Sequence, residues 1–150
     1  MIRIRVNGLP APQGSKRHVG NGRMVESSKA VGPWREAVRA EAQKILVVDV
    51  VMGLTPRDIP VSLTAVFLLP RPAGHYGTGR NAGQVRKSAP PYPAGRPDLD
   101  KLLRALLDGL TAAGVWRDDA QVASVNAAKV WCGPEEAPGV IIEVDGLKEA

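Results

Sequence analysis

The stretch RPDLDKLLRALLDGLTAAGVWRDDAQV, residues 96–122, combines a leucine-rich helical pattern with five aspartates in a chain that is basic overall. Its leucines share one face when successive residues turn by about 100°, as in an α-helix that packs on a sheet. They are Leu99, Leu102, Leu103, Leu106, Leu107 and Leu110. The pattern predicts a helix over residues 99–113, with Gly114 as its stop signal, because glycine adopts the left-handed conformation that ends many helices.

The segments on either side predict a sheet and a second helix. Residues 2–6 alternate apolar and basic side chains with the period of a strand, and residues 61–69 form an apolar, β-branched run typical of a buried strand. Residues 33–48 begin with proline and carry apolar side chains at helical spacing. Residues 121–132 and 139–146 are interpreted as two strands of a closing hairpin. This order predicts an α+β fold of two layers, with helices packed on one mixed, largely antiparallel sheet.

The length and composition predict one domain. At 150 residues and 44% hydrophobic content, the chain can bury a single core. Residues 70–97 are rich in proline and glycine and poor in apolar side chains. Such a segment cannot bury itself, and a loop of this length is usually functional or disordered. We therefore expect a single domain over residues 1–150, with a long, mobile, basic loop at residues 70–97 that becomes ordered on its partner.

The positive charge is concentrated in two segments without acidic residues. The chain has a formal net charge of +5 and an isoelectric point near 9.7, and residues 1–25 and 70–97 each hold five Lys or Arg and no Asp or Glu. Ordinary surface charge would mix both signs, so this separation favours a polyanionic partner, above all nucleic acid. The candidate DNA-binding residues are Lys16, Arg17, Arg23, Arg71, Arg80, Arg86, Lys87, Arg96 and Lys101.

Other features exclude several classes of protein. Cys132 is the only cysteine, which rules out an intrachain disulfide and a multi-cysteine zinc site and suits a small core residue. The 4% aromatic content gives no sign of a scaffold for an aromatic small-molecule cofactor. No apolar run reaches the length of about 18–20 residues that a membrane span needs, and the N-terminus lacks a signal-peptide pattern. We expect a cytoplasmic protein without a membrane partner.

The aspartates flank the predicted helix. Asp98 and Asp100 stand two apart where extended chain enters it, so both carboxylates can face one side. Asp98 has an alternative role as a helix N-cap, but capping accounts for only one aspartate. A helix of about 15 residues followed by a reversal would return Asp118 and Asp119 to the sheet. Because carboxylates are preferred ligands of Mg²⁺, three acids from two elements would suit metal-assisted hydrolysis of a phosphodiester.

Two further charged residues lie on the flank of the helix. Arg104 lies one turn after Asp100, where it would pair with that carboxylate or stabilise negative charge in a transition state. Asp108, another turn along, is assigned to a polar helix face or to a structural bond.

With this leucine-rich helix and the aspartates that flank it, residues 96–122 resemble the central motif of the RusA family of Holliday-junction resolvases, which are phage-associated endonucleases. That motif runs approximately P-D-x-D-N-x-x-K, then L-D-A-L, then G-h-h-x-D-D-x-Q-V, where h is hydrophobic. Residues 6–18, VNGLPAPQGSKRH, resemble more loosely the family's N-terminal G-x-P-x-P-x-G segment. The resemblance implies a RusA-like homodimer that binds four-way DNA junctions and cuts symmetric strands with Mg²⁺, for which Mn²⁺ could substitute.

The resemblance also assigns roles to individual residues. Carried over position by position, the family's catalytic and metal-binding acids fall on Asp98, Asp100 and Asp119, with Asp118 as a further candidate metal ligand. The family's catalytic lysine falls on Arg104, which keeps the positive charge but cannot deprotonate. The family's asparagine falls on Lys101, a second departure that bears on any contact made there.

Three functions compete at this point. The leading hypothesis is an Mg²⁺-dependent, structure-selective endodeoxyribonuclease that resolves four-way junctions in DNA recombination and repair or in phage branched-DNA processing. The first alternative is a non-catalytic protein of the same fold that binds junctions or other branched DNA. The second is a metal-dependent phosphohydrolase of small nucleotides, which the basic loops disfavour because so small a substrate would not need them.

Overall fold

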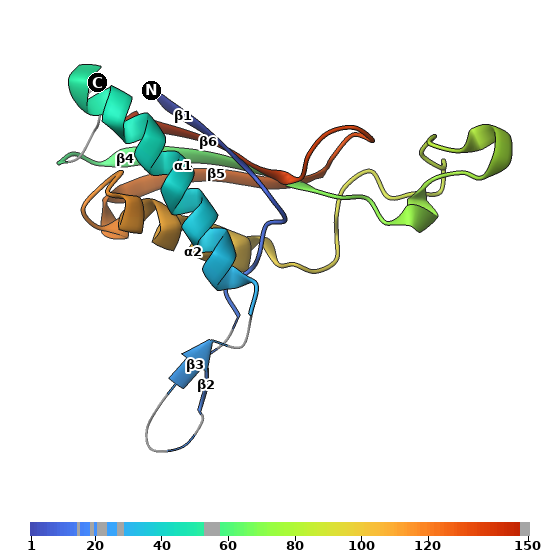
Figure 1. Ribbon diagram of the computed structural model, residues 1–150, viewed down its shortest axis with the longest axis horizontal. Coiled ribbons are helices and arrows are strands. Elements are labelled where there is room, and N and C mark those ends of the chain that lie inside the picture. Colours follow the sequence, from blue (N-terminus) through green and yellow to red (C-terminus); the bar gives the residue numbers. More distant parts are fainter. Residues whose placement is uncertain (15, 19, 21–23, 27–28, 53–57, 148–150) are drawn as a thin grey trace.

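The computed structural model describes two helices on a four-stranded sheet, from which two segments project (Figure 1). The described residues are 1–14, 16–18, 20, 24–26, 29–52 and 58–147. Helix α1 spans Val31–Met52 and helix α2 spans Leu99–Ala113, as the leucine pattern predicted. The sheet consists of β1 (Ile2–Asn7), β4 (Val61–Leu69), β5 (Val122–Trp131) and β6 (Gly139–Gly146). Within these described residues, no helix is both long and apolar enough to cross a membrane.

The sheet is mixed and largely antiparallel, as predicted. Its strand order is β1-β6-β4-β5: β6 pairs antiparallel with β1 and β4, and β4 pairs parallel with β5. The predicted hairpin of the last two strands is wrong, because β4 lies between β5 and β6. Parallel neighbours need a long crossover connection, which residues 70–121 supply with α2 at their centre. Periodicity identified both strands correctly but carried no information about their neighbours.

The core lies between the sheet and the two helices, which cover one face of the sheet (Figure 1). The helices contribute Trp34, Val38, Ala42 and Leu46 from α1, and Leu102, Leu106 and Leu110 from α2. The two helices meet at Gly109, where an added Cβ would lie only 2.8 Å from Cγ1 of Val38. Glycine at this position therefore lets the helices approach more closely than any side chain would allow.

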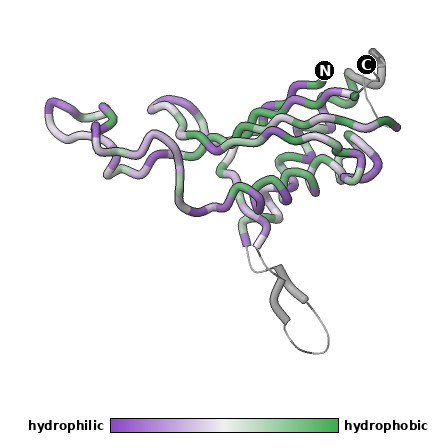
Figure 2. The backbone as a smooth tube through the Cα atoms, turned by 180° about the vertical axis from the view of Figure 1, so that it is seen from behind, coloured by the Kyte–Doolittle hydropathy of each residue, from purple (hydrophilic) through white to green (hydrophobic). Residues whose placement is uncertain are grey.

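The arm, residues 70–97, extends away from the body and is mostly hydrophilic (Figure 2). It contains two short 3-10 helices, η1 (Ala73–His75) and η2 (Gly79–Asn81). Inside it, the N–H of Gly77 donates to the carbonyl of Gln84 at 2.8 Å. At its base, Nε1 of Trp131 in β5 donates to the carbonyl of Pro90 at 3.1 Å. The arm thus has a backbone structure of its own, while its mobility and its ordering on a partner stay predictions.

A short hairpin forms the second projection. Strand β2 (Lys16–His18) pairs antiparallel with β3 (Met24–Glu26), outside the main sheet. The two three-residue strands show that the segment contains local pairing.

Candidate active site

The N-terminal end of α2 presents the first pair of aspartates. Asp98 occupies the N-cap position, but its side chain accepts no capping hydrogen bond, and its Oδ2 lies 3.7 Å from Nζ of Lys101. Asp100 lies in the first turn, where the helix dipole favours negative charge. Just before the helix, Nζ of Lys129 in β5 donates to the carbonyl of Pro97 at 3.0 Å. Capping therefore accounts for the backbone position of Asp98 and not for its carboxylate.

The flank of α2 carries Asp100, Arg104 and Asp108 at intervals of one helical turn. Arg104 is exposed and forms none of the ion pairs found among the described residues, so the pairing with Asp100, one of its two predicted roles, is not found there. Asp108 instead reaches α1, where its Oδ2 lies 3.5 Å from Nη1 of Arg35. This contact confirms the structural bond that was one of the two interpretations of Asp108.

A tight reversal carries the chain from α2 to the second pair of aspartates. Gly114 is left-handed, with φ of 84°, and its N–H donates to the carbonyls of Leu110 and Thr111, which confirms the predicted stop signal. Trp116 is buried, and its Nε1–H donates to Oγ1 of Thr111 at 2.7 Å. These bonds tie the segment after α2 to the last turn of the helix.

The second pair of aspartates belongs to a capped turn, the 3-10 helix η3 (Asp119–Gln121). Oδ1 of Asp118 accepts from the N–H of Ala120 at 2.8 Å. In return, Oε1 of Gln121 accepts from the N–H of Arg117 at 2.8 Å and from that of Asp118 at 3.2 Å. This reciprocal capping gives the glutamine of the D-D-x-Q pattern a structural role. It fixes Asp118 within the turn, with the exposed Asp119 beside it.

The carboxyl group of Asp119 is perturbed by its acidic neighbours. A hydrogen bond with Asp118, followed by slight burial and by the negative charges of Asp118 and Asp108, raises the pKa of Asp119 above its ordinary value. Carboxylates this close repel one another when both are ionised, and a proton or a cation between them relieves that repulsion. None of the ion pairs among the described residues includes Asp118 or Asp119. Their donor chemistry therefore suits a bound cation.

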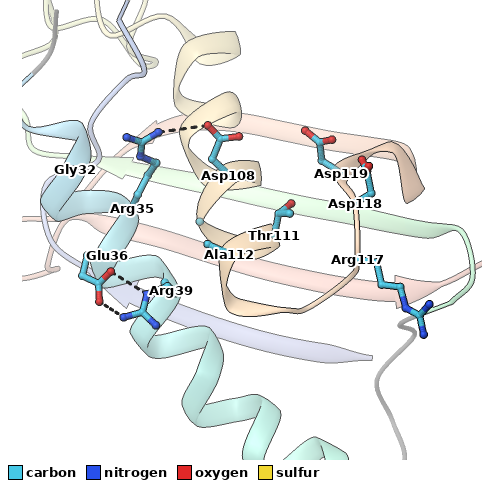
Figure 3. Close-up of a pocket in the computed structure, with 11 residues that line it drawn as sticks. Gly32, Arg35, Glu36, Arg39, Asp108, Thr111, Ala112, Arg117, Asp118 and Asp119 are labelled. Atoms are coloured by element: carbon cyan, nitrogen blue, oxygen red, sulfur yellow. Dashed lines mark hydrogen bonds and ion pairs between the residues drawn. The ribbon is translucent and has the colours of Figure 1, made fainter. Parts of the chain in front are cut away.

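These side chains line a cavity of about 640 Å³, which we call the α1–α2 cavity (Figure 3). One wall carries Arg35, Glu36 and Arg39 of α1; the floor carries Asp108 and Thr111 of α2; the far wall carries Arg117, Asp118 and Asp119. Arg39 is bound by Glu36 on its own helix. Nε of Arg117 lies 2.8 Å from Oδ1 of Asp58, a residue outside the cavity lining. Acidic side chains therefore dominate the far wall, with Arg35 opposite.

A single chain does not bring all the predicted acids together. Asp108, Asp118 and Asp119 line the cavity, whereas Asp98 and Asp100 lie at the start of α2, about 12–15 Å before Asp108 along the helix axis. In the part of the chain that the structure describes, no group of three or more Asp, Glu, His or Cys residues could hold a metal ion. The cause is the crossover, because the end of α2, rather than its start, adjoins η3. The catalytic and metal-binding roles of these acids stay predictions.

Within the arm, the predicted DNA-binding residues differ in their surroundings. Arg80, Lys87 and Arg96 are exposed. Arg71 packs against the sheet, with its guanidinium carbon 5.5 Å from the ring centroid of Trp131. Arg86 is also exposed, but its Nε donates to the carbonyl of Tyr76 at 2.8 Å. Arg71 and Arg86 thus contribute to the structure of the arm, whereas the other three are directed to solvent.

The remaining DNA-binding candidates lie near the body or outside the described part. Lys101 is half-buried beside Asp98 at the start of α2. Lys16 and Arg17 belong to β2, whose side chains lie outside the described part, and Arg23 lies outside the described residues altogether. DNA binding by these residues stays a prediction.

Sequence reasoning missed the α1 wall of the cavity. Positions 32, 35, 36 and 39 all line it and follow the i, i+3, i+4, i+7 spacing of one helix face. That spacing was the available signal. It was overlooked because polar residues on an amphipathic helix ordinarily face solvent, and the sequence does not reveal that this face lies beside α2.

Comparison with known proteins agrees with the motif. A family model described as Endodeoxyribonuclease RusA matches residues 7–145, which is nearly the whole chain. No curated protein matches the chain significantly. The matched range includes the arm, both pairs of aspartates and the residues of the α1–α2 cavity. The resemblance noted in residues 96–122 is therefore confirmed, and the chain belongs to the RusA family of endodeoxyribonucleases.

Proposed function

We propose that this endodeoxyribonuclease resolves four-way DNA junctions by divalent-metal-dependent phosphodiester hydrolysis, as a homodimer in the bacterial cytoplasm. The family match over residues 7–145 supports the nuclease activity and the choice of branched DNA. The observation that carries the proposal is the hydrogen-bonded pair Asp118 and Asp119 in a cavity large enough for a backbone phosphate. The role would be DNA recombination and repair or the processing of branched phage DNA.

The donor set of the cavity fits a hard divalent cation such as Mg²⁺ or Mn²⁺. Mg²⁺ is usually held by only one or two carboxylates together with waters and substrate phosphate. Asp118 and Asp119 can supply that pair, and Asp98 and Asp100 form a second pair at the other end of α2. When bound, the metal would polarise the phosphoryl group and lower the pKa of a water ligand.

The residues of the chain would perform the remaining steps. A carboxylate oxygen of Asp119 would accept a hydrogen bond from the attacking water and orient it toward the phosphorus. Arg104 keeps the positive charge that the family places at this position. Since its guanidinium remains protonated, it would act as a fixed charge toward phosphate rather than as a proton donor.

The arm and the basic N-terminal segment would bind the DNA duplexes that branch from the junction. Arg80 and Lys87 of the arm are exposed, and no acidic residue lies between positions 70 and 97 to oppose phosphate binding. A twofold symmetric dimer would present two equivalent sites to two symmetric strands. It would also give the separated acids a way to meet, because Asp98 and Asp100 of a second copy could approach Asp119 of the first.

A non-catalytic junction-binding protein is the second candidate. The observation in its favour is that no group of three metal-ligating side chains occurs among the described residues. Such a protein would bind junctions with or without Asp119.

The decisive test is cleavage of an end-labelled four-way junction beside linear duplex of the same sequence. Wild type and Asp119→Asn are each assayed with Mg²⁺ and with EDTA. Paired symmetric nicks on the junction alone, dependent on both Mg²⁺ and Asp119, are expected. Tight binding without cleavage under any divalent metal would refute the nuclease proposal and support the non-catalytic candidate.

A further inference from the structure

The α1 wall of the α1–α2 cavity carries an arginine without a place in the chemistry described above. Arg35 faces the side of the cavity that carries Asp118 and Asp119, with Asp108 between them (Figure 3). Nη1 of Arg35 lies 3.5 Å from Oδ2 of Asp108 and 3.5 Å from Oε1 of Gln13. Its side chain is 35% exposed and lines the cavity.

These two contacts do not account for an arginine at this position. A separation of 3.5 Å is longer than the usual N–H···O range of about 2.7–3.2 Å, and a half-exposed ion pair of this kind contributes little to stability. Both contacts use Nη1. A guanidinium carries five N–H donors in a planar fork, so Nε and Nη2 of Arg35 can serve a further acceptor, and the fork matches two oxygens of one phosphate.

The other two arginines of the cavity are committed elsewhere. Arg39 is paired with Glu36 and donates to Oε1 of Gln43 at 2.9 Å, all on α1. Arg117 pairs with Asp58 at 2.8 Å, outside the cavity lining. Of the three arginines that line the cavity, Arg35 is therefore the one best placed to meet an anion.

A phosphate in the cavity needs positive charge on the side away from Asp118 and Asp119, because those carboxylates repel it. We propose that Arg35 binds a backbone phosphate of the cleaved DNA strand in the α1–α2 cavity, donating two N–H groups to its non-bridging oxygens, with Asp108 as the positioning residue for the guanidinium. This inference rests on the proposed nuclease function and deepens it. It places the cleaved strand between α1 and η3.

The test combines Arg35→Gln with junctions in which a single phosphate is replaced by an uncharged methylphosphonate. The replacement is made in turn at each of the two phosphates that flank the scissile one, where cleavage is measured. At the scissile phosphate, where the replacement itself alters the reacting group, junction affinity in EDTA is compared instead. On the unmodified junction, Arg35→Gln should cut about ten- to a hundredfold more slowly than wild type, as expected for the loss of charge-assisted hydrogen bonds. On the junction modified at the contacted phosphate, the two enzymes should cut at equal rates, because the partner of Arg35 is already lost.

Two variants serve as controls. Lys44→Gln removes one positive charge from the same helix, but Nζ of Lys44 is paired with Glu41 and lies outside the cavity lining. Its cleavage rate should stay within about twofold of wild type, the range expected for an exposed surface charge. Arg35→Lys should recover part of the lost rate, since it restores the charge without the fork. Thermal unfolding of each variant establishes that it is folded before its rate is compared.

The result distinguishes this inference from the proposed function. If wild type cuts and Arg35→Gln loses the same factor on every methylphosphonate junction, the role of Arg35 is structural and the inference is wrong. If Arg35→Gln cuts like wild type, the inference is also wrong, although the nuclease proposal stands. If wild type does not cut, the nuclease proposal fails. Junction affinity in EDTA, measured through the same combinations, then decides whether Arg35 binds phosphate.

Discussion

Replacing Gly109 with alanine tests how closely α1 and α2 must approach to form the cavity. An added Cβ would lie 2.8 Å from Cγ1 and 3.0 Å from Cβ of Val38, and 3.2 Å from the backbone oxygen of Arg35. The shortest distance is below normal contact for two carbon atoms. Val38 is fully buried, so its side chain has no empty space to enter. Helix α1 must therefore move away from α2, and Arg35 must move with it.

Two opposing effects set the size of the change in stability. Overpacking of this kind costs typically about 1–3 kcal/mol, whereas alanine in place of glycine inside a helix gains about 1 kcal/mol. The middle of the overpacking range is about 2 kcal/mol, and the gain in helix propensity offsets about 1 kcal/mol of it. We therefore expect Gly109→Ala to lower the free energy of unfolding by about 1 kcal/mol. In a Val38→Ala background the contact with Cγ1 is absent, while Cβ of residue 38 and the Arg35 oxygen still lie 3.0 and 3.2 Å away, so the same replacement should change the free energy of unfolding by about 0 kcal/mol. The coupling energy is then about 1 kcal/mol.

Urea unfolding followed by tryptophan fluorescence measures all four proteins of this cycle. Equal slopes against urea would establish that the variants unfold alike. Gly32→Ala provides the matched control, because an added Cβ at that position in α1 meets no atom within 4 Å. It should leave stability unchanged or slightly raised. An effect of Gly109→Ala with the same sign and size in both backgrounds would show that the helices do not meet as described.

Three further predictions concern the base of the arm, the cysteine and the dimer. Trp131→Ala removes the ring that packs against Arg71 and the hydrogen bond to the Pro90 carbonyl. Trypsin should therefore cut within the arm faster than in wild type, and an unchanged rate would mean that Trp131 does not hold the arm. Burial, more than the nearby charge of Glu136, raises the pKa of the Cys132 thiol. At pH 8 this thiol should therefore react with a disulfide reagent much more slowly in the folded protein than in urea, and equal rates would contradict its burial. Inactive Asp98→Asn and Asp119→Asn proteins, mixed and allowed to exchange subunits, should regain one nick per junction if each site combines the two copies; a mixture that stays inactive would place each site within one copy.

The fold was predictable wherever a residue's local neighbours determine its structure. The leucines of α2 marked its length correctly, and Gly114 marked its end, because helix packing and the left-handed stop are local properties. The pairing of β5 with β4 was not predictable, because strand neighbours depend on the path of a long connection. Periodicity shows which face of a strand is buried and says nothing about which strand lies beside it.

The candidate site divides in the same way. The D-D-x-Q pattern marked a real unit, and the structure adds that Gln121 acts through backbone hydrogen bonds. The contact between Arg35 and Asp108 joins residues 73 positions apart and depends on how two helices cross. The distance between Asp98 and Asp119 likewise depends on the direction in which α2 runs along the sheet. Neither relation is present in the spacing of the residues.

The arm joins the body at one end of the sheet, where β4 ends at Leu69 beside Trp131 of β5. Strand β5 contacts both sides of the base: Arg71 on the outgoing side lies over the Trp131 ring, and on the returning side Trp131 donates to Pro90 and Lys129 to Pro97. Since doubling the length of a loop costs only about 0.6 kcal/mol in closure entropy, the arm can be lengthened, shortened or rewritten with little effect on the layers beneath it. Natural or engineered variants could thereby acquire a different reach along DNA while inheriting the same hydrolytic machinery.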